Sequence, residues 1–332
     1  RGGMPRQTEA GYNRPIEGQP DKWSPFDMKF GGFWEGGKHW SEIVGDDAID
    51  YLNMAKKTDN PFFMYIAFNA PHDPRQSPKE YVDRYPLDKI AVPKNFVPEH
   101  PFNEALESGR KLRAERLAPF PRTKHSVKVN RQEYYAIITH MDHQIGRILK
   151  ALEETGQADN TYIFFTADHG LACGQHGLLG KQNMFEHSVR VPMMVVGPDI
   201  PRQKKLDMPV YLQDVMASSL ELADVEKPDY VQFRSLLPLI SGERDSNYDA
   251  IYGAYVTGQR MVTVGDWKMI LYPKAKKALL YNVAEDPLEM NDLAAKAEHK
   301  KTMKSLFQRL LKLQEETGDE MDLKKTFPNL AA

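Results

Sequence analysis

The amino-acid sequence predicts an α/β protein with a mainly parallel sheet flanked by helices, followed by a small antiparallel sheet with one helix. Continuous apolar runs bounded by turn residues predict buried strands, and an amphipathic helix lies between two of them. Strands that alternate with helices favour parallel pairing, because each helix then crosses a face of the sheet. Short alternating segments at hairpin spacing predict the antiparallel part.

The composition is that of a globular chain whose charges nearly cancel. Its 332 residues include 44 Lys and Arg against 46 Asp and Glu, so it has neither a basic footprint for nucleic acid nor an acidic tail. Hydrophobic residues make up 41%, which is enough for a core. No apolar run approaches the ~20 residues of a membrane helix. Cys173 is the only cysteine, so no internal disulfide forms, and a structural or incidental role is expected for it.

Composition divides the chain into three stretches. Residues 1–40 are rich in Gly, Pro and aromatic residues, which predicts an irregular segment, and they contain no apolar signal segment. Residues 41–245 predict the α/β domain. Residues 246–332 predict an α+β subdomain.

The first half of the α/β domain begins with a helix. Ser41 is the expected N-cap, and apolar residues three and four apart extend one face to Ala55. The apolar run Phe62–Phe68 predicts a strand covered on both faces. Residues 71–121 hold nine of the 23 prolines, which predicts an irregular surface excursion bordering a site.

The second half contains the clearest helix. We expect Asn130 to cap a helix over about 131–155 that ends at Gly156. Buried strands are predicted at Thr161–Thr166 and Val191–Val196.

The C-terminal subdomain shows period-two alternation. Gly265-Asp266 is the expected hairpin turn, and residues 298–316 form an amphipathic helix. The predicted strands are Ile251–Tyr255, Gln259–Val264, Trp267–Tyr272 and a further strand at Tyr281–Val283.

Ionisable residues follow two of the predicted buried strands. One strand leads to His72, and the other to Asp168 and His169. If the strands are parallel, these residues share the edge of the sheet at which ligands bind.

The Asp168-His169-Gly170 corner offers two ligand types for a metal ion, although a hydrogen-bonded turn has the same residues. In the Gly-rich stretch that follows, Lys181 is suited to hold an oxyanion, and a solvated lysine is the alternative. His140 and His143, three residues apart on the long helix, are compatible with shared ligation. We favour a simpler interpretation, in which one histidine flanks the core and the other meets solvent or a carboxylate such as Asp142.

Taken together, these segments resemble the type I, formylglycine-dependent sulfatases. The resemblance covers most of the chain from about residue 41, and its motifs are specific only in combination. They are Phe62–Pro74, Thr166–Gly170, Gly174–Gly177 with Lys181, Phe185–Pro192, Trp267–Ile270, Leu280–Asn282 and Glu285–Pro287.

The resemblance implies an alkaline-phosphatase-like fold that hydrolyses sulfuric esters with a bound calcium. Asp168 and His169 would be calcium ligands, His72 would contact the sulfate and assist departure of the alcohol, and Lys181 would bind a sulfate oxygen. His176 would join His72 and Lys181 in binding substrate. Cationic groups and a metal suit this chemistry, because negative charge builds up as the ester is attacked. Such enzymes are commonly exported, so the resemblance implies a periplasmic or secreted location.

One part of the family pattern is absent. The nucleophile arises from Cys or Ser in a Cys/Ser-x-Pro-x-Arg sequence, which this chain lacks, and Cys173 is followed by Gly174-Gln175-His176. We therefore interpret the chain as the C-terminal two-thirds of a sulfatase, which needs a missing N-terminal segment to complete its site and is inactive alone.

The substrate is less constrained than the reaction. A sulfated carbohydrate is expected, and Arg110, Arg113 and Arg116 are candidates for contact with an acidic sugar, while choline sulfate and aryl sulfates stay open. Two other functions are compatible with the sequence. One is a phosphate ester metallohydrolase of the same superfold, and the other is a non-catalytic glycan-binding remnant.

Overall fold

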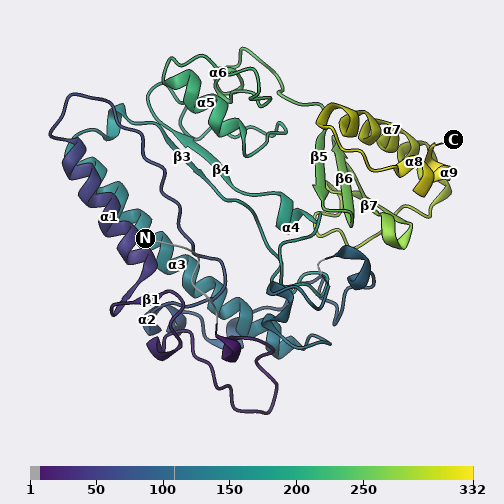
Figure 1. The fold of residues 1–332 in the computed structure, drawn as a ribbon, viewed down its shortest axis with the longest axis horizontal. Helices are drawn as coiled ribbons and strands as arrows, with labels where there is room; N and C mark the ends of the chain where they lie inside the picture. Colours follow the sequence, from purple (N-terminus) through teal and green to yellow (C-terminus); the bar gives the residue numbers. More distant parts are fainter. Residues whose placement is uncertain (1–7, 108, 332) are drawn as a thin grey trace. The chain divides into compact units, whose positions relative to one another are not determined.

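The computed structural model describes residues 8–107 and 109–331, and the chain forms two compact units (Figure 1). Because three segments of each unit alternate along the chain, neither unit is one continuous stretch. The first comprises Arg1–His100, Arg110–Thr161 and Cys173–Leu179, and the second Pro101–Gly109, Tyr162–Ala172 and Gly180–Ala332. The boundaries 41–245 and 246–332 stay a prediction.

Two packed helices, α1 (Trp40–Ala55) and α3 (Lys124–Thr155), form the core of the first unit. The short hairpin β1 (Trp34–Glu35) and β2 (Lys38–His39) leads into α1. Ser41 does not cap this helix, because the Nδ1 atom of His39 accepts the Ser41 N–H instead. The short helix α2 (Lys79–Asp83) packs on α3.

Helix α3 begins earlier than the sequence predicts. The Thr123 hydroxyl oxygen caps it by accepting the Ser126 N–H at 3.0 Å, and the Ser126 hydroxyl oxygen accepts the Thr123 N–H. The expected cap, Asn130, lies buried about two turns inside the helix, where its amide donates to the Ser126 carbonyl. The end at Gly156 is confirmed, and its φ of 77° suits glycine.

The apolar run Phe62–Phe68 is not a strand among the described residues, which corrects the expectation from its composition. Exposure alternates along it with the period of an extended segment, so that Phe63 is 75% and Tyr65 81% exposed. Strand character requires a hydrogen-bonded neighbour as well as apolar side chains.

Apart from residue 108, which is not described, the proline-rich stretch contains only short helices: α2 and the 3-10 turns Leu87–Lys89, Asn103–Leu106 and Ala114–Leu117. It is nevertheless anchored by a buried ion pair. Arg122 donates to the Glu115 carboxylate at 2.6 Å, and that carboxylate also accepts the Leu179 N–H at 3.1 Å. Both charged side chains are almost fully buried.

In the second unit, β3 (Ile163–Thr166) and β4 (Met193–Val196) pair antiparallel, with Phe164 opposite Val195. The parallel pairing predicted for these strands is therefore wrong. The connection between them holds only α4 (Glu186–Val189), which is too short to form a helical crossover. Helices α5 (Asp214–Leu222) and α6 (Leu237–Ser241) follow.

The predicted C-terminal sheet is confirmed. Strands β5 to β8 form an antiparallel sheet in sequence order, with Gly265 in the β6–β7 turn at a φ of 55°. Helix α7 (Lys300–Thr317) lies along it, followed by α8 (Leu323–Thr326) and α9 (Pro328–Ala331) (Figure 1). The strands are β5 (Ile251–Tyr255), β6 (Gln259–Val264), β7 (Trp267–Tyr272) and β8 (Lys277–Asn282). None of the helices in the described ranges is long and apolar enough to cross a membrane.

Candidate functional site

Asp168 and His169 lie exposed in the loop directly after β3. The Nδ1 atom of His169 lies 2.6 Å from the Gly170 carbonyl oxygen, so its N–H donates there and the Nε2 lone pair stays available. The Asp168 carboxylate has no hydrogen bond or ion pair with any described residue. The corner thus presents one hard oxygen donor and one imidazole nitrogen to solvent.

Gly170 fixes this corner against α4. Its N–H donates to the Ser188 carbonyl at 3.0 Å. A Cβ atom at this position would lie 2.2 Å from the His187 carbonyl oxygen, well inside contact distance. Only glycine therefore allows the two backbones to approach this closely.

Lys181 is attached to the same part of the second unit. The Ala172 N–H donates to the Gly180 carbonyl at 2.9 Å, which brings the start of the Lys181 segment to the end of the corner. Lys181 is half-buried, and no described side chain or carbonyl pairs with its ammonium group. The second unit thus holds Asp168, His169 and Lys181 on two hydrogen-bonded segments.

His72 lies in the first unit, in a turn closed by its N–H on the Asn69 carbonyl. Its Nδ1 atom lies 2.7 Å from the Asp73 carbonyl oxygen and 2.9 Å from the carboxylate Oδ1. The Arg113 guanidinium lies 3.4 Å from its Nε2 atom. Asp73 thus orients the His72 ring through Nδ1, and the Arg113 guanidinium lies next to Nε2. That His72 shares a rim with Asp168 and His169 stays a prediction.

Asp73 was not predicted to be part of the His72 environment, although it adjoins His72 in the chain. Burial alone would raise the pKa of Asp73, but the hydrogen bond from His72 and the nearby guanidinium groups of Arg113 and Arg75 lower it below its usual value. The Asp73 carboxylate is therefore ionised where it contacts the His72 ring. Of the three arginines considered for an acidic sugar, Arg110 pairs with Glu99 and Arg116 with Glu9.

His176 occupies a tight turn in the first unit at a φ of 52°. Its N–H donates to the Asn95 carbonyl at 2.9 Å, and its Nε2 atom lies 3.2 Å from the Asn95 amide. The neighbouring His100 is buried, and desolvation together with His176 lowers its pKa to about 3. These contacts anchor the turn, and a role for His176 in binding substrate stays a prediction.

The simpler interpretation of His140 and His143 agrees with the structure. His140 is buried in ring contact with His39 and Tyr81, whereas His143 is exposed and meets the Tyr81 hydroxyl. Burial and the nearby His143 lower the pKa of His140 to about 4.

No three His, Cys, Asp or Glu side chains gather as a metal site in the described ranges. Cys173 is buried beside Arg75, and burial raises the pKa of its thiol.

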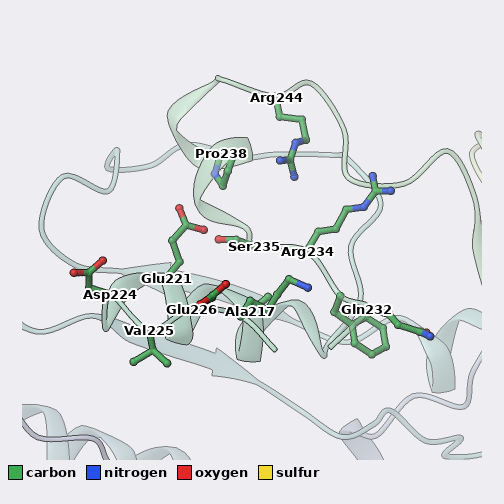
Figure 2. A pocket seen from close by; sticks show the side chains of 12 residues that line it. Ala217, Glu221, Asp224, Val225, Glu226, Gln232, Arg234, Ser235, Pro238 and Arg244 are labelled. Atoms are coloured by element: carbon green, nitrogen blue, oxygen red, sulfur yellow. The ribbon is translucent and has the colours of Figure 1, made fainter. Parts of the chain in front are cut away.

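The second unit also contains an open pocket of about 870 Å³ at α5 and α6 (Figure 2). None of the predicted site residues lines it. Figure 2 shows Glu221 and Asp224 at the end of α5 and Arg234 and Arg244 on the segments beyond it. Both arginines donate a hydrogen bond to Asn247, which holds their side chains in place.

Comparison with known proteins places these segments in context. The sequence profile of the family described as Sulfatase matches residues 3–225, which is more than half of the chain. The chain belongs to the sulfatase family. A second profile, N-sulphoglucosamine sulphohydrolase, C-terminal, matches residues 174–316. An arylsulfatase from Clostridium perfringens is 31% identical over 289 residues, covering 84% of this chain and 58% of the relative.

Solved structures confirm the alkaline-phosphatase-like fold class. A protein crystallised with its substrate D-glucosamine-2-N,6-O-disulfate has a TM-score of 0.73 at 23% identity, covering 92% of this chain and 76% of its own. A phosphonate monoester hydrolase from Silicibacter pomeroyi has a TM-score of 0.75 at 20% identity, covering 92% and 65%. This sulfatase-family chain spans about half the length of the curated relatives it matches.

Proposed function

We propose that this chain carries the metal-binding and anion-binding residues of a sulfuric ester hydrolase that acts on a sulfated carbohydrate or another organic sulfate. The observation that carries the proposal is the corner after β3. There His169 donates through Nδ1 to the Gly170 carbonyl, beside the unpaired carboxylate of Asp168. Membership of the sulfatase family supports the choice of sulfate.

One carboxylate oxygen and one imidazole nitrogen can contribute to a divalent cation site, and the family resemblance implies calcium as the ion. Metal-binding histidines generally donate their other ring N–H to a carbonyl or carboxylate, which orients the ring, and His169 has this arrangement. Asp168 and His169 would hold the ion, with other ligands completing the shell, since calcium takes six to eight. When bound, the cation would neutralise negative charge on the sulfate group.

The remaining roles belong to cationic side chains. Lys181 would hold a sulfate oxygen with its ammonium group, which no described group neutralises. His72, oriented through Nδ1 by Asp73, would contact the sulfate and act as the acid that assists departure of the alcohol as the S–O bond breaks. A positioned acid of this kind accelerates such a step by roughly 100- to 10,000-fold.

The attacking group is not among these residues. Because the sequence contains no Cys/Ser-x-Pro-x-Arg, we expect binding of sulfated ligands but negligible turnover of p-nitrophenyl sulfate by this 332-residue polypeptide with calcium. Turnover comparable to that of a complete sulfatase would contradict this expectation.

Calorimetric titration with calcium tests the proposed metal site at Asp168 and His169, which we call the metal corner. We expect one ion per chain, and binding that is lost in Asp168→Asn. Asp207→Asn is the matched control, because Asp207 is also an exposed aspartate of the second unit without a described partner. Equal calcium affinity in the parent chain and in Asp168→Asn would exclude the proposed site.

A phosphoryl substrate is the second candidate, favoured by the TM-score of 0.75 to the phosphonate monoester hydrolase. Metal analysis distinguishes the two candidates, since two zinc ions per chain would favour phosphoryl chemistry and a single calcium ion sulfate chemistry. A non-catalytic role in glycan binding predicts that D-glucosamine-2-N,6-O-disulfate binds to the chain with affinity that Lys181→Met reduces, whatever the fate of the ester.

A further inference from the structure

A buried lysine of the C-terminal sheet bridges two glutamates. Lys268 on β7 is 0% exposed, and its Nζ atom lies 2.8 Å from Oε1 of Glu186 and 2.8 Å from Oε1 of Glu289. Glu289 in turn accepts the Glu186 N–H at 2.7 Å. Burying a charged lysine costs free energy unless oppositely charged partners compensate for the lost hydration. For Lys268, the two glutamates provide this compensation.

Glu186 is the first residue of α4, the helix against which the metal corner rests. The helical turn is closed by the Arg190 N–H on the Glu186 carbonyl at 2.9 Å. Within that turn the Ser188 carbonyl accepts the Gly170 N–H at 3.0 Å. A continuous series of contacts therefore leads from Lys268 through α4 to the residue that follows Asp168 and His169.

A second contact ties the same sheet to the Lys181 segment. Gln259 on β6 is fully buried, and its amide donates to the Gln182 carbonyl at 2.9 Å, one residue after Lys181. The Phe185 ring packs against Tyr281 of β8 with centroids 6.2 Å apart. The segment 181–186 is thus held by three neighbouring strands of the C-terminal sheet.

We propose that Lys268, acting through Glu186, is a positioning residue for the Asp168–His169 corner and for Lys181. The proposal rests on the function proposed above and assigns the C-terminal sheet a role in that site. Lys268 touches neither substrate nor metal. It keeps α4 in place, and α4 keeps the Gly170 backbone, and with it the two ligand side chains, in the orientation that binds the ion.

Two variants and two measurements test this role. Lys268→Met removes the charge and keeps the length of the stem. Glu186→Ala removes the direct ion pair between Lys268 and α4, while Lys268 stays paired with Glu289 and the backbone N–H of residue 186 still donates to Glu289, which protects the fold if the first variant is too unstable. Lys277→Met is the control, because Lys277 lies on β8 of the same sheet and pairs with Asp292 at 2.9 Å, outside the series of contacts.

The first measurement is hydrogen exchange at the Gly170 amide of the whole chain, and the second is calorimetric titration with calcium. We expect exchange at Gly170 to rise at least about tenfold and calcium affinity to fall about tenfold in both test variants, since outer partners of metal ligands typically have effects of about 10- to 100-fold. Lys277→Met leaves both unchanged, and Lys268→Arg restores part of the affinity because it keeps a cation between the two glutamates.

The outcomes separate this inference from the proposed function. If the parent chain binds no calcium, the metal site fails, and the exchange rate at Gly170 alone decides the positioning role. If Gly170 exchanges at the parent rate in both Lys268→Met and Glu186→Ala, the positioning role is wrong even where calcium binds. An equal loss in Lys277→Met would assign the effect to general weakening of the sheet and would also overturn the proposal.

Discussion

The two sheets described in the second unit differ in how completely their side chains are covered. In the β5–β8 sheet, Met269 is 0% exposed and packs with Phe307 and Leu310 of α7. In the β3–β4 pair, Met194 is 53% and Val196 61% exposed. Met and Val therefore occur on strands of both sheets, and the elements packed on a strand decide whether its apolar side chains form a core.

The largest expected effect comes from truncating the same residue type in each sheet. Met269→Ala should lower the free energy of unfolding by about 2–5 kcal/mol, because it removes buried apolar volume and leaves a cavity. Met194→Ala should change it by less than about 0.5 kcal/mol. Urea denaturation of the two variants measures both values. Similar losses would show that burial does not decide how much a methionine on these strands contributes to stability.

Gly170, which follows Asp168 and His169 after β3, is tightly packed. Gly170→Ala places a methyl group on the His187 carbonyl oxygen and should cost about 1–3 kcal/mol, the usual range for overpacking. It should also weaken calcium binding. Gly146→Ala is the control, since its Cβ would meet nothing within 4 Å. An unaltered stability in Gly170→Ala would show that the two backbones separate easily.

The C-terminal sheet should also respond to acid. Hydrogen bonds from Arg260, followed by those from Tyr252 and Gln314, hold the pKa of Asp319 well below its usual range, although burial opposes this. The stabilisation is therefore complete above about pH 4, where the unfolded aspartate is ionised, and is lost as the pH falls further, because the unfolded chain binds the proton first. Asp319→Asn should cost about 1–2 kcal/mol at pH 7 and flatten the decline below pH 4 in urea titrations. A decline as steep as in the parent would assign the acid sensitivity to other groups.

The smallest expected effect is at the exposed end of β4. Val196→Thr should change stability by less than about 0.5 kcal/mol and reduce self-association at high protein concentration, because it interrupts an exposed apolar strand face. The same substitution at Val262 of β6, which is buried, should be clearly destabilising because it buries a hydroxyl. Denaturation and light scattering distinguish these outcomes, and unchanged scattering for Val196→Thr would mean that the exposed face does not drive association.

Elements specified by neighbouring residues were predictable from the sequence, whereas contacts between distant segments were not. Strands β5 to β7 were predictable because alternation and the Gly265 turn are local features of the sequence. The antiparallel pairing of β3 and β4 was not, since an apolar run carries no information about the direction of its neighbour. Phe62–Phe68 has the composition of a strand, but pairing also depends on distant segments.

The candidate site shows the same limit. His72, Asp168 and His169 were predicted as site residues because they follow apolar runs, and Lys181 because it lies in a Gly-rich stretch. Their supporting partners were not, because Lys268 and Glu186 are 82 positions apart and only the folded chain brings them together. The start of α3 was missed because Thr123 and Ser126 cap each other seven residues before the predicted start.

The buried pair Arg122–Glu115 should slow cleavage of the proline-rich stretch by proteases. Trypsin cleaves after arginine only where the backbone opens enough to enter its cleft, and this depends on the cost of local unfolding. Opening the chain at Arg122 would break a fully buried charge pair and free the Leu179 N–H at the same time. Although it contains little regular secondary structure, the chain around residues 115–122 should therefore resist nicking as a well-packed helix does.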